Sequence, residues 1–252
     1  MVHFVGAGPG AVDLITVRGL SLLKDADVVI YAGSLVNPEL LKNCNNECEI
    51  HNSAYMNLEE VIETMKKAEF EGKSVVRLHT GDPSLYGAIK EQIDLLEKYN
   101  IKFDICPGVS SFCGAASSLS AEYTLPGISQ SVIITRMEGR TPVPEKESIE
   151  SFAAHQATMV IFLSTGMLEK LQQRLIEGGY PPQTKAAIVY KSTWPDEKVF
   201  RCRLDELYET AKKENITKTA LIVVGEILGD EYEYSKLYDK TFTTEFRKGI
   251  NE

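Results

Sequence analysis

Near its start the chain reads Val2-His3-Phe4-Val5-Gly6-Ala7-Gly8-Pro9-Gly10-Ala11, a short apolar run followed by three glycines in five residues. The apolar residues of Val2–Gly6 predict a buried first β-strand. The glycines that follow predict a loop whose backbone lies close to another group, because glycine has no Cβ. Gly6–Ala11 also fits the G-x-G-x-x-[GA] pattern of dinucleotide-binding folds, although a single match of this kind is weak evidence.

Three features count against a dinucleotide site. Pro9 removes one backbone N–H from any phosphate cradle. The first helix is expected only after Thr16, so its N-terminus lies too far along the chain to bind a pyrophosphate. The second strand, Val28–Ala32, is followed by Gly33-Ser34, where dinucleotide-binding folds carry the acidic residue that binds the ribose.

Short apolar runs alternate with amphipathic helical patterns along the chain, which predicts an α/β fold. Leu125-Pro126-Gly127 interrupts the pattern, which then restarts, so we expect two α/β domains over residues 1–122 and 126–229 and a tail over 230–252. The expected helices are those after Thr16 and over Leu58–Phe70, Tyr86–Lys98, Ser110–Glu122, Ser148–His155, Met167–Gly178 and Leu204–Lys213. The later strands are expected over Ser74–His79, Lys102–Cys106, Ser131–Thr135, Thr158–Ser164, Lys185–Lys191, Lys198–Arg203 and Thr219–Gly225.

Composition excludes several classes of function. The 252 residues are 43% hydrophobic and 25% charged, as in a protein with a buried core, and the net charge of −9 counts against nucleic-acid binding. No apolar run approaches the roughly 20 residues of a membrane span. The five cysteines form no CxxC pair, and the four histidines show no ligand spacing. We therefore expect a cytoplasmic protein with reduced thiols, no membrane contact and no metal of its own.

Two further loops follow predicted strands, Thr80–Gly87 and Pro107–Ser111. Ligands of open α/β sheets bind beyond the carboxyl ends of the strands. Asp82 in the first of these loops is a candidate ligand-binding residue, and the cap of the following helix is an equally good interpretation. Three glycine-containing loops at strand ends indicate a shared ligand site.

Taken as a set, Gly6–Gly10, Asp13–Thr16, Gly81–Pro83 and Pro107–Ser111 resemble the tetrapyrrole methyltransferase superfamily, over nearly the whole chain. Thr135–Glu145, Tyr190–Glu197 and Ser235–Tyr238 are similar to its precorrin-4 C11-methyltransferase subgroup. The resemblance implies two α/β domains with the active-site cleft between them, unlike the usual methyltransferase fold. It implies a homodimer that methylates C11 of precorrin-4 or cobalt-precorrin-4 in cobalamin biosynthesis. S-adenosyl-L-methionine would be the donor and S-adenosyl-L-homocysteine the product.

The resemblance also implies which residues bind the donor: Pro9, Gly81, Asp82, Leu85, Ser110, Ser111, Leu163, Tyr190 and Ala220. For the carboxylates of the tetrapyrrole substrate we expect Arg136 and Arg140 as clamps, because guanidinium groups bind carboxylates with two parallel hydrogen bonds. The alternative is a solvated loop in which Glu138 is a local salt-bridge partner. No general base is assigned.

Other functions stay open at this stage. Another methyltransferase of the superfamily, such as uroporphyrinogen-III C-methyltransferase, is the main alternative, and Arg136–Glu145 counts against it. A nucleotide-linked dehydrogenase lacks its acidic residue after strand two, and a non-catalytic tetrapyrrole-binding module is the third possibility. The sequence does not distinguish a cobalt-bound substrate from a metal-free one.

Overall fold

The computed structural model describes residues 1–250, except for the side chain of Ser34. It divides the chain into two compact units. The first unit contains Met1–Ser118 together with Tyr190–Lys198, and the second contains Leu119–Val189 and Val199–Glu252. Each unit has its own five-stranded sheet, and the predicted α/β class is confirmed.

The sheet of the first unit is parallel, with the strand order β3-β2-β4-β1-β5. Gly6 at the end of β1 is level with His79 at the end of β4, so the loops after these strands leave from the same edge. The loop after β5 leaves from that edge too. The five strands are β1 (Val2–Gly6), β2 (Val28–Tyr31), β3 (Glu49–Asn52), β4 (Val75–His79) and β5 (Phe103–Cys106).

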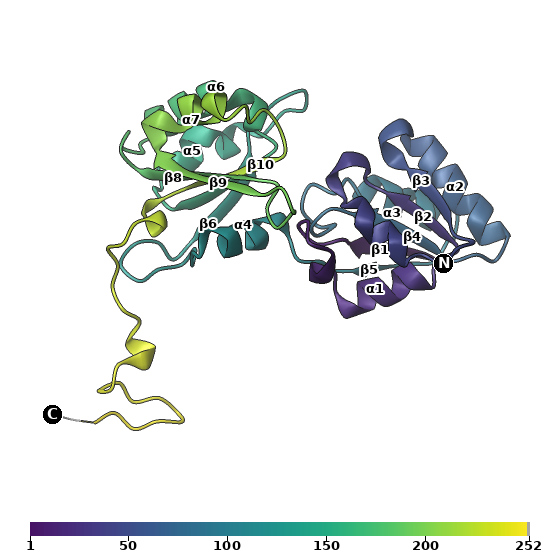
Figure 1. Cartoon of the computed structure of the whole chain (residues 1–252), viewed down its shortest axis with the longest axis horizontal. Helices are drawn as coiled ribbons and strands as arrows, with labels where there is room; N and C mark the ends of the chain where they lie inside the picture. Colours follow the sequence, from purple (N-terminus) through teal and green to yellow (C-terminus); the bar gives the residue numbers. More distant parts are fainter. Residues whose placement is uncertain (251–252) are drawn as a thin grey trace. The chain divides into compact units, whose positions relative to one another are not determined.

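Helices cover both faces of this sheet (Figure 1). Residues of α2 (Leu58–Phe70) and α3 (Lys90–Lys98) pack with Phe4 and Ile30 in one core cluster. On the other face, residues of α1 (Val17–Lys24) pack with Val5, Val29 and Leu78. The predicted cap of α1 is confirmed, because the Thr16 hydroxyl accepts a hydrogen bond from the N–H of Gly19. The helix α4 (Ser111–Leu119) follows β5.

The sheet of the second unit is mixed, with the order β6-β7-β10-β8-β9. β6 is parallel to β7, and β10 is antiparallel to β7. The helices α5, α6 and α7 lie together on one face of this sheet (Figure 1). The strands are β6 (Val132–Arg136), β7 (Thr158–Phe162), β8 (Lys185–Tyr190), β9 (Lys198–Arg203) and β10 (Ala220–Val224), and the helices are α5 (Ile149–Ala153), α6 (Leu168–Glu177) and α7 (Leu207–Lys213).

Apart from shifts of two or three residues at element ends, such as that of α4 at Leu119, the structure differs from the expected elements in three places. The edge strand β3 was not predicted, because Glu49-Ile50-His51-Asn52 is polar and short. α3 begins at Lys90 and not at Tyr86, since Tyr86 and Ala88 both have positive φ angles. The segment Tyr190–Lys198, expected within the C-terminal domain, lies in the first unit.

The part of the tail that the structure describes, residues 230–250, is largely exposed and has one short 3₁₀ turn at Lys236–Tyr238. Within residues 1–250, no helix combines the length and the apolar character that crossing a bilayer requires.

Candidate functional site

Two of the three glycine-containing loops are joined directly by backbone hydrogen bonds. The glycine loop (Gly6–Ala11) and the loop over Thr80–Gly87, here called the GDP loop after its residues Gly81-Asp82-Pro83, form an antiparallel bridge between Gly8 and Gly81. The N–H of Gly81 donates to the carbonyl of Gly8 at 2.8 Å, and the N–H of Gly8 donates back to Gly81 at 3.3 Å. The N–H of Ala7 also donates to the carbonyl of His79 at 2.7 Å. The two loops therefore form one backbone unit.

The third loop, Pro107–Ser111, approaches so closely that only glycine fits at the contact. A Cβ on Gly6 would lie 2.5 Å from the Cα of Gly108, and a Cβ on Gly108 would lie 2.2 Å from the carbonyl oxygen of Gly81. Real Cβ atoms do not approach backbone so closely, so these glycines are required by contact between backbones. Ser111 is next to Gly81 as well, with its N–H 3.3 Å from the Cβ position of Gly81.

Asp82 fastens the GDP loop to the third loop. Its Oδ2 accepts a hydrogen bond from the N–H of Gly108 at 2.8 Å, and its Oδ1 accepts from the N–H and the hydroxyl of Ser84. Partial burial alone would raise the pKa of Asp82, but the Ser84 hydroxyl and the two N–H groups outweigh it and hold the pKa below its usual range. The helix-cap interpretation is wrong, because α3 begins at Lys90 without a side-chain cap.

The backbone of the glycine loop is largely occupied by protein groups. The carbonyl of Pro9 accepts from the Trp194 indole at 3.2 Å, and the carbonyl of Gly10 accepts from Asn37 at 2.8 Å. The N–H of Ala11 donates to Thr193 Oγ1 at 2.9 Å. A phosphate cradle needs free N–H groups, and those of Ala7, Gly8 and Ala11 are all engaged. This geometry agrees with the expectation that the loop is not a diphosphate site.

A buried charge and a buried imidazole lie behind these loops on β4. Burial lowers the pKa of Arg77 to about 10, and its guanidinium donates to Gln92 and to the carbonyl of Ile30, each at 3.1 Å. Burial, followed by the charge of Arg77, lowers the pKa of His79 to about 3. His79 is only 4% exposed, and its Nε2 has no hydrogen-bond partner within residues 1–250. His79 is thus a neutral, buried side chain behind the site.

In the second unit, the turn after β7 exposes an apolar side chain. Leu163 is 63% exposed and has a φ of 53°, in the left-handed region that is uncommon for leucine. The fully buried Ser164 holds this turn, since its hydroxyl donates to Phe162 at 2.7 Å and accepts from the N–H of Met137 at 2.9 Å. The Thr165 hydroxyl donates to the carbonyl of Ala220 at 3.0 Å, so the turn is also tied to β10.

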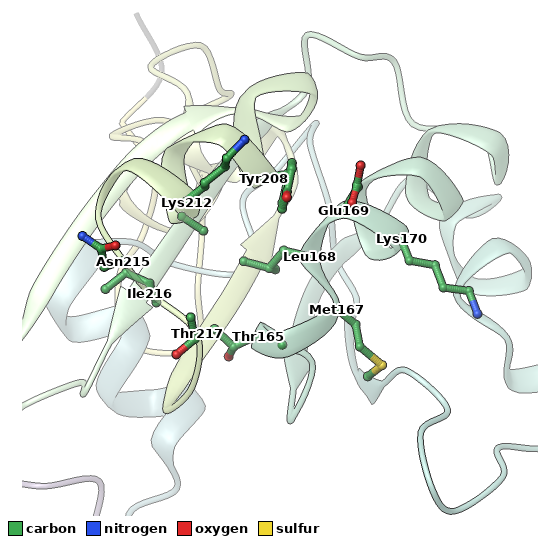
Figure 2. Close-up of a pocket in the computed structure, with 12 residues that line it drawn as sticks. Thr165, Met167, Leu168, Glu169, Lys170, Tyr208, Lys212, Asn215, Ile216 and Thr217 are labelled. Atoms are coloured by element: carbon green, nitrogen blue, oxygen red, sulfur yellow. The ribbon is translucent and has the colours of Figure 1, made fainter.

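A cavity of about 550 Å³ begins next to this turn (Figure 2). Thr165 and Thr217 lie at one end of the view and Tyr208 and Lys212 at the other. None of the predicted site residues lines it, although the hydrogen bond from Thr165 to Ala220 connects it to one of them. Its lining residues come from the 3₁₀ turn Thr165–Met167, from α6 and α7, and from the loop over 215–217. They form no sequence motif, so sequence reasoning had no signal for this cavity.

The two predicted arginine clamps differ in their surroundings. The Arg136 guanidinium donates to the carbonyls of Met137 at 3.1 Å, Thr141 at 3.3 Å and Pro142 at 2.9 Å, so it holds its own loop together. Arg140 is exposed, and its side chain forms no hydrogen bond or ion pair within residues 1–250. Arg140 is the side chain of the two that is free to meet a ligand.

Glu138, in the same loop, pairs with the largely buried guanidinium of Arg174, which also binds Glu150. The interpretation of Glu138 as the salt-bridge partner of Arg136 or Arg140 is therefore wrong. Within the described part of the chain, no three His, Cys, Asp or Glu side chains gather as a metal site would require.

The family model for tetrapyrrole (corrin/porphyrin) methylases matches residues 1–208. The chain belongs to this family. A relative in Methanocaldococcus jannaschii, named cobalt-precorrin-4 C(11)-methyltransferase, is 58% identical over 98% of this chain and 96% of its own. The solved structure of the cobalt-precorrin-4 methyltransferase CbiF has a TM-score of 0.89 at 45% identity, over 91% of this chain and 96% of that one.

A more distant solved structure is the uroporphyrin-III C-methyltransferase of Thermus thermophilus in complex with S-adenosyl homocysteine. The match to it has a TM-score of 0.76 at 26% identity and covers 90% of the 252-residue chain and 92% of the Thermus chain. The predicted resemblance is confirmed by these comparisons.

Each predicted donor-binding residue of the methylase lies in one unit or the other. The GDP-loop and third-loop residues are brought together by the contacts of Gly81 and Asp82, and Pro9 lies beside Gly114 of α4. The first unit carries Pro9, Gly81, Asp82, Leu85, Ser110, Ser111 and Tyr190, and the second carries Leu163 and Ala220. Their role in binding stays a prediction.

Sequence reasoning missed the residues of the methylase that hold the site in shape. Ser164 and Thr165 are followed by glycine, so a turn is predictable there. The carbonyls that their hydroxyls bind are not predictable from the sequence. Thr193 and Trp194 bind a loop more than 180 residues away in the chain, and no local pattern predicts such a contact.

Proposed function

We propose that this methylase transfers a methyl group from S-adenosyl-L-methionine to C11 of cobalt-precorrin-4 or of its metal-free counterpart, in cobalamin biosynthesis. The observation that carries the proposal is the full-length similarity to a cobalt-precorrin-4 C(11)-methyltransferase, at 58% identity. The residues Thr135–Glu145, typical of that subgroup, comprise the end of β6 and the loop after it, which Arg136 and Glu138 hold in place. We favour the cobalt-bound substrate because this relative and CbiF are both named for it.

The residues present fit the methyl donor. When bound, S-adenosyl-L-methionine supplies a methyl group already activated by its sulfonium, so the protein chiefly orients the reactants and excludes water. Exposed Leu163 offers an apolar surface suited to adenine, in a turn whose backbone Ser164 fixes. Ionised Asp82 fixes the GDP and third loops, where Gly81, Ser110 and Ser111 would contact the donor.

Charge near the sulfonium matters more than a strong acid or base. When bound, the donor would bring a sulfonium charge that is lost on transfer, so carbonyl dipoles fixed in advance would bind and orient it. The carbonyls of Pro9 and Gly10 are already held by Trp194 and Asn37, which keeps their orientation fixed before any ligand arrives. His79 is neutral and buried, and we assign it no proton transfer.

Substrate carboxylates would meet Arg140. Its exposed guanidinium is free, whereas all the hydrogen bonds of Arg136 serve its own loop. We therefore propose Arg140 as a direct contact to a carboxylate, and Arg136 as the residue that gives the loop its shape.

The cellular compartment and the oligomeric state are part of the same proposal. We propose that the enzyme works in the cytoplasm as a homodimer that binds no nucleic acid. All five cysteines are free thiols, which agrees with a reducing compartment. The dimer rests on the family resemblance, and its mass in solution by light scattering is the direct measurement.

The proposal is tested by incubating the purified protein with S-adenosyl-L-methionine and either cobalt-precorrin-4, metal-free precorrin-4 or uroporphyrinogen III. We expect a product heavier by one methyl group with a precorrin-4 substrate, at a rate well above that with uroporphyrinogen III. Faster methylation of uroporphyrinogen III would contradict the proposal and favour the related C-methyltransferase. Binding of NAD in place of the donor would favour a dehydrogenase.

A further inference from the structure

The segment Tyr190–Lys198 joins β8 to β9 and is strained. Lys191 has a φ of 47° and Thr193 a φ of 65°. Positive φ is costly for any residue with a Cβ and is unusual for a β-branched residue such as threonine. Strain of this kind persists only where the surroundings impose it, and it gathers at functional sites.

Hydrogen bonds within the first unit impose this conformation. The Glu197 carboxylate accepts from the N–H of Thr193 and, at 2.6 Å, from the hydroxyl of Ser118 in α4. The N–H of Trp194 donates to Lys191 at 3.0 Å. The Lys191 ammonium lies 5.2 Å from the centre of the Trp194 ring. Its ion pair with the exposed carboxylate of Asp196, at 2.6 Å, is not one of these restraints, because within residues 1–250 Asp196 forms no hydrogen bond with Thr193 or with the glycine loop.

The strained residues contact the glycine loop. Thr193 Oγ1 accepts from the N–H of Ala11, and the Trp194 indole donates to the carbonyl of Pro9. A Cβ on Gly10 would lie 2.0 Å from the Trp194 ring, so the indole covers the backbone at this position. The segment thus holds the glycine loop on both sides of Gly10, and one of the two residues it contacts, Pro9, is itself a predicted donor contact.

We propose that Thr193 and Trp194 are positioning residues that hold the glycine loop in the conformation that binds the methyl donor. This inference rests on the proposed function, since it assigns a role at that same site. Neither residue touches the reacting atoms. They act through the backbone of Pro9–Ala11, so their loss weakens donor binding more than substrate binding.

The experiment compares four variants by calorimetric titration with S-adenosyl-L-homocysteine, with thermal unfolding measured alongside. Thr193→Val removes the hydroxyl and keeps the shape, and Trp194→Phe removes the indole N–H and keeps a ring. Thr193→Ser keeps the hydroxyl and is the rescue variant. Asp196→Asn breaks only the exposed pair with Lys191 and is the matched control.

We expect Thr193→Val and Trp194→Phe each to weaken donor binding by about five-fold, the effect of one lost hydrogen bond. Thr193→Ser and Asp196→Asn are expected to bind as the wild type does. KM for the tetrapyrrole should stay unchanged while KM for the donor rises. A purely structural role would lower the melting temperature without this difference between the two KM values.

Wild-type affinity in both Thr193→Val and Trp194→Phe, or an equal loss in Asp196→Asn, would overturn the inference and leave the proposed function standing. A wild type that binds no donor would instead contradict the proposed function, and the inference with it.

Discussion

Asp82 shows how one carboxylate serves two loops. It accepts hydrogen bonds from Gly108 and from Ser84, and none from the helix that follows it. A residue that is already satisfied in this way positions a ligand site more than it binds a ligand. The donor contacts expected from the GDP loop then fall to the backbone around Gly81 and to Leu85.

Replacing Asp82 by Asn puts an N–H₂ group where one carboxylate oxygen now accepts a hydrogen bond. We expect the free energy of unfolding to fall by about 1–3 kcal/mol, because a partly buried N–H loses its partner. Donor affinity should fall as well. Urea unfolding and calorimetric titration measure the two effects, with Ser84→Ala as the control that removes only the hydroxyl donor. Unchanged donor affinity in Asp82→Asn would show that the loops hold together without this carboxylate.

His79 makes stability depend on pH. Its pKa falls from 6.5 to about 3 on folding, so between these values the unfolded chain binds more protons than the folded one. Stability is therefore full above pH 6.5 and is lost as the pH falls toward 3, with a slope that approaches about 1.4 kcal/mol per pH unit.

We expect His79→Gln to remove this part of the pH dependence, because glutamine does not titrate. Urea unfolding of both proteins at pH 7 and pH 5 gives the comparison. An equal loss of stability in wild type and variant over this interval would contradict the role of His79.

At the scale of elements, the loop over 136–142 is ordered by its own first residue. Arg136 binds three carbonyls of the loop, and Glu138 ties it to α6 through Arg174. The sequence-based prediction gave Arg136 and Arg140 the same role as substrate clamps, whereas their surroundings in the structure differ. Arg140 is expected to bind substrate, and Arg136 to build the loop.

Arg140→Ala should therefore raise KM for the tetrapyrrole by about ten-fold with little change in melting temperature, since a charged hydrogen bond contributes about 1.5–3 kcal/mol. Arg136→Ala should lower both stability and activity, because three carbonyls lose their donor. Steady-state kinetics and thermal unfolding of both variants check this, with Lys146→Ala in the following exposed turn as a control. An unchanged KM in Arg140→Ala would remove this residue from the site.

Most elements could be predicted because their signals are local. The apolar runs of β1 and β4 and the cap at Thr16 depend on neighbouring residues, and each appears close to where it was expected. β3 was missed because a polar edge strand has no apolar pattern. The late start of α3 was missed because the positive φ angles of Tyr86 and Ala88 have no signal in residues that are not glycine.

At the scale of the whole molecule, long-range contacts limit what the sequence predicts. Glycines identified the loops after β1, β4 and β5, and parallel pairing explains why these loops leave from one edge. The bridge between Gly8 and Gly81, and the return of Thr193 and Trp194 to the glycine loop, depend on the complete fold. The function was predicted from the family resemblance. The structure shows why glycines occupy these loops, because their backbones are in direct contact.

The net charge of −9 counts against some anionic partners and not against others. An acidic protein binds a polycarboxylate only through local cations, and Arg140 is an exposed guanidinium without a partner in the described part of the chain. The overall charge leads us to expect no nucleic-acid partner, but it does not exclude an anionic small molecule.

The most direct measurement is the position of the transferred methyl group. The enzyme is incubated with cobalt-precorrin-4 and S-adenosyl-L-methionine carrying a carbon-13 methyl group, and the product is analysed by nuclear magnetic resonance. Our account predicts one labelled methyl group, bonded to C11. A labelled methyl group at any other ring carbon, or no transfer from a donor that binds, would contradict it.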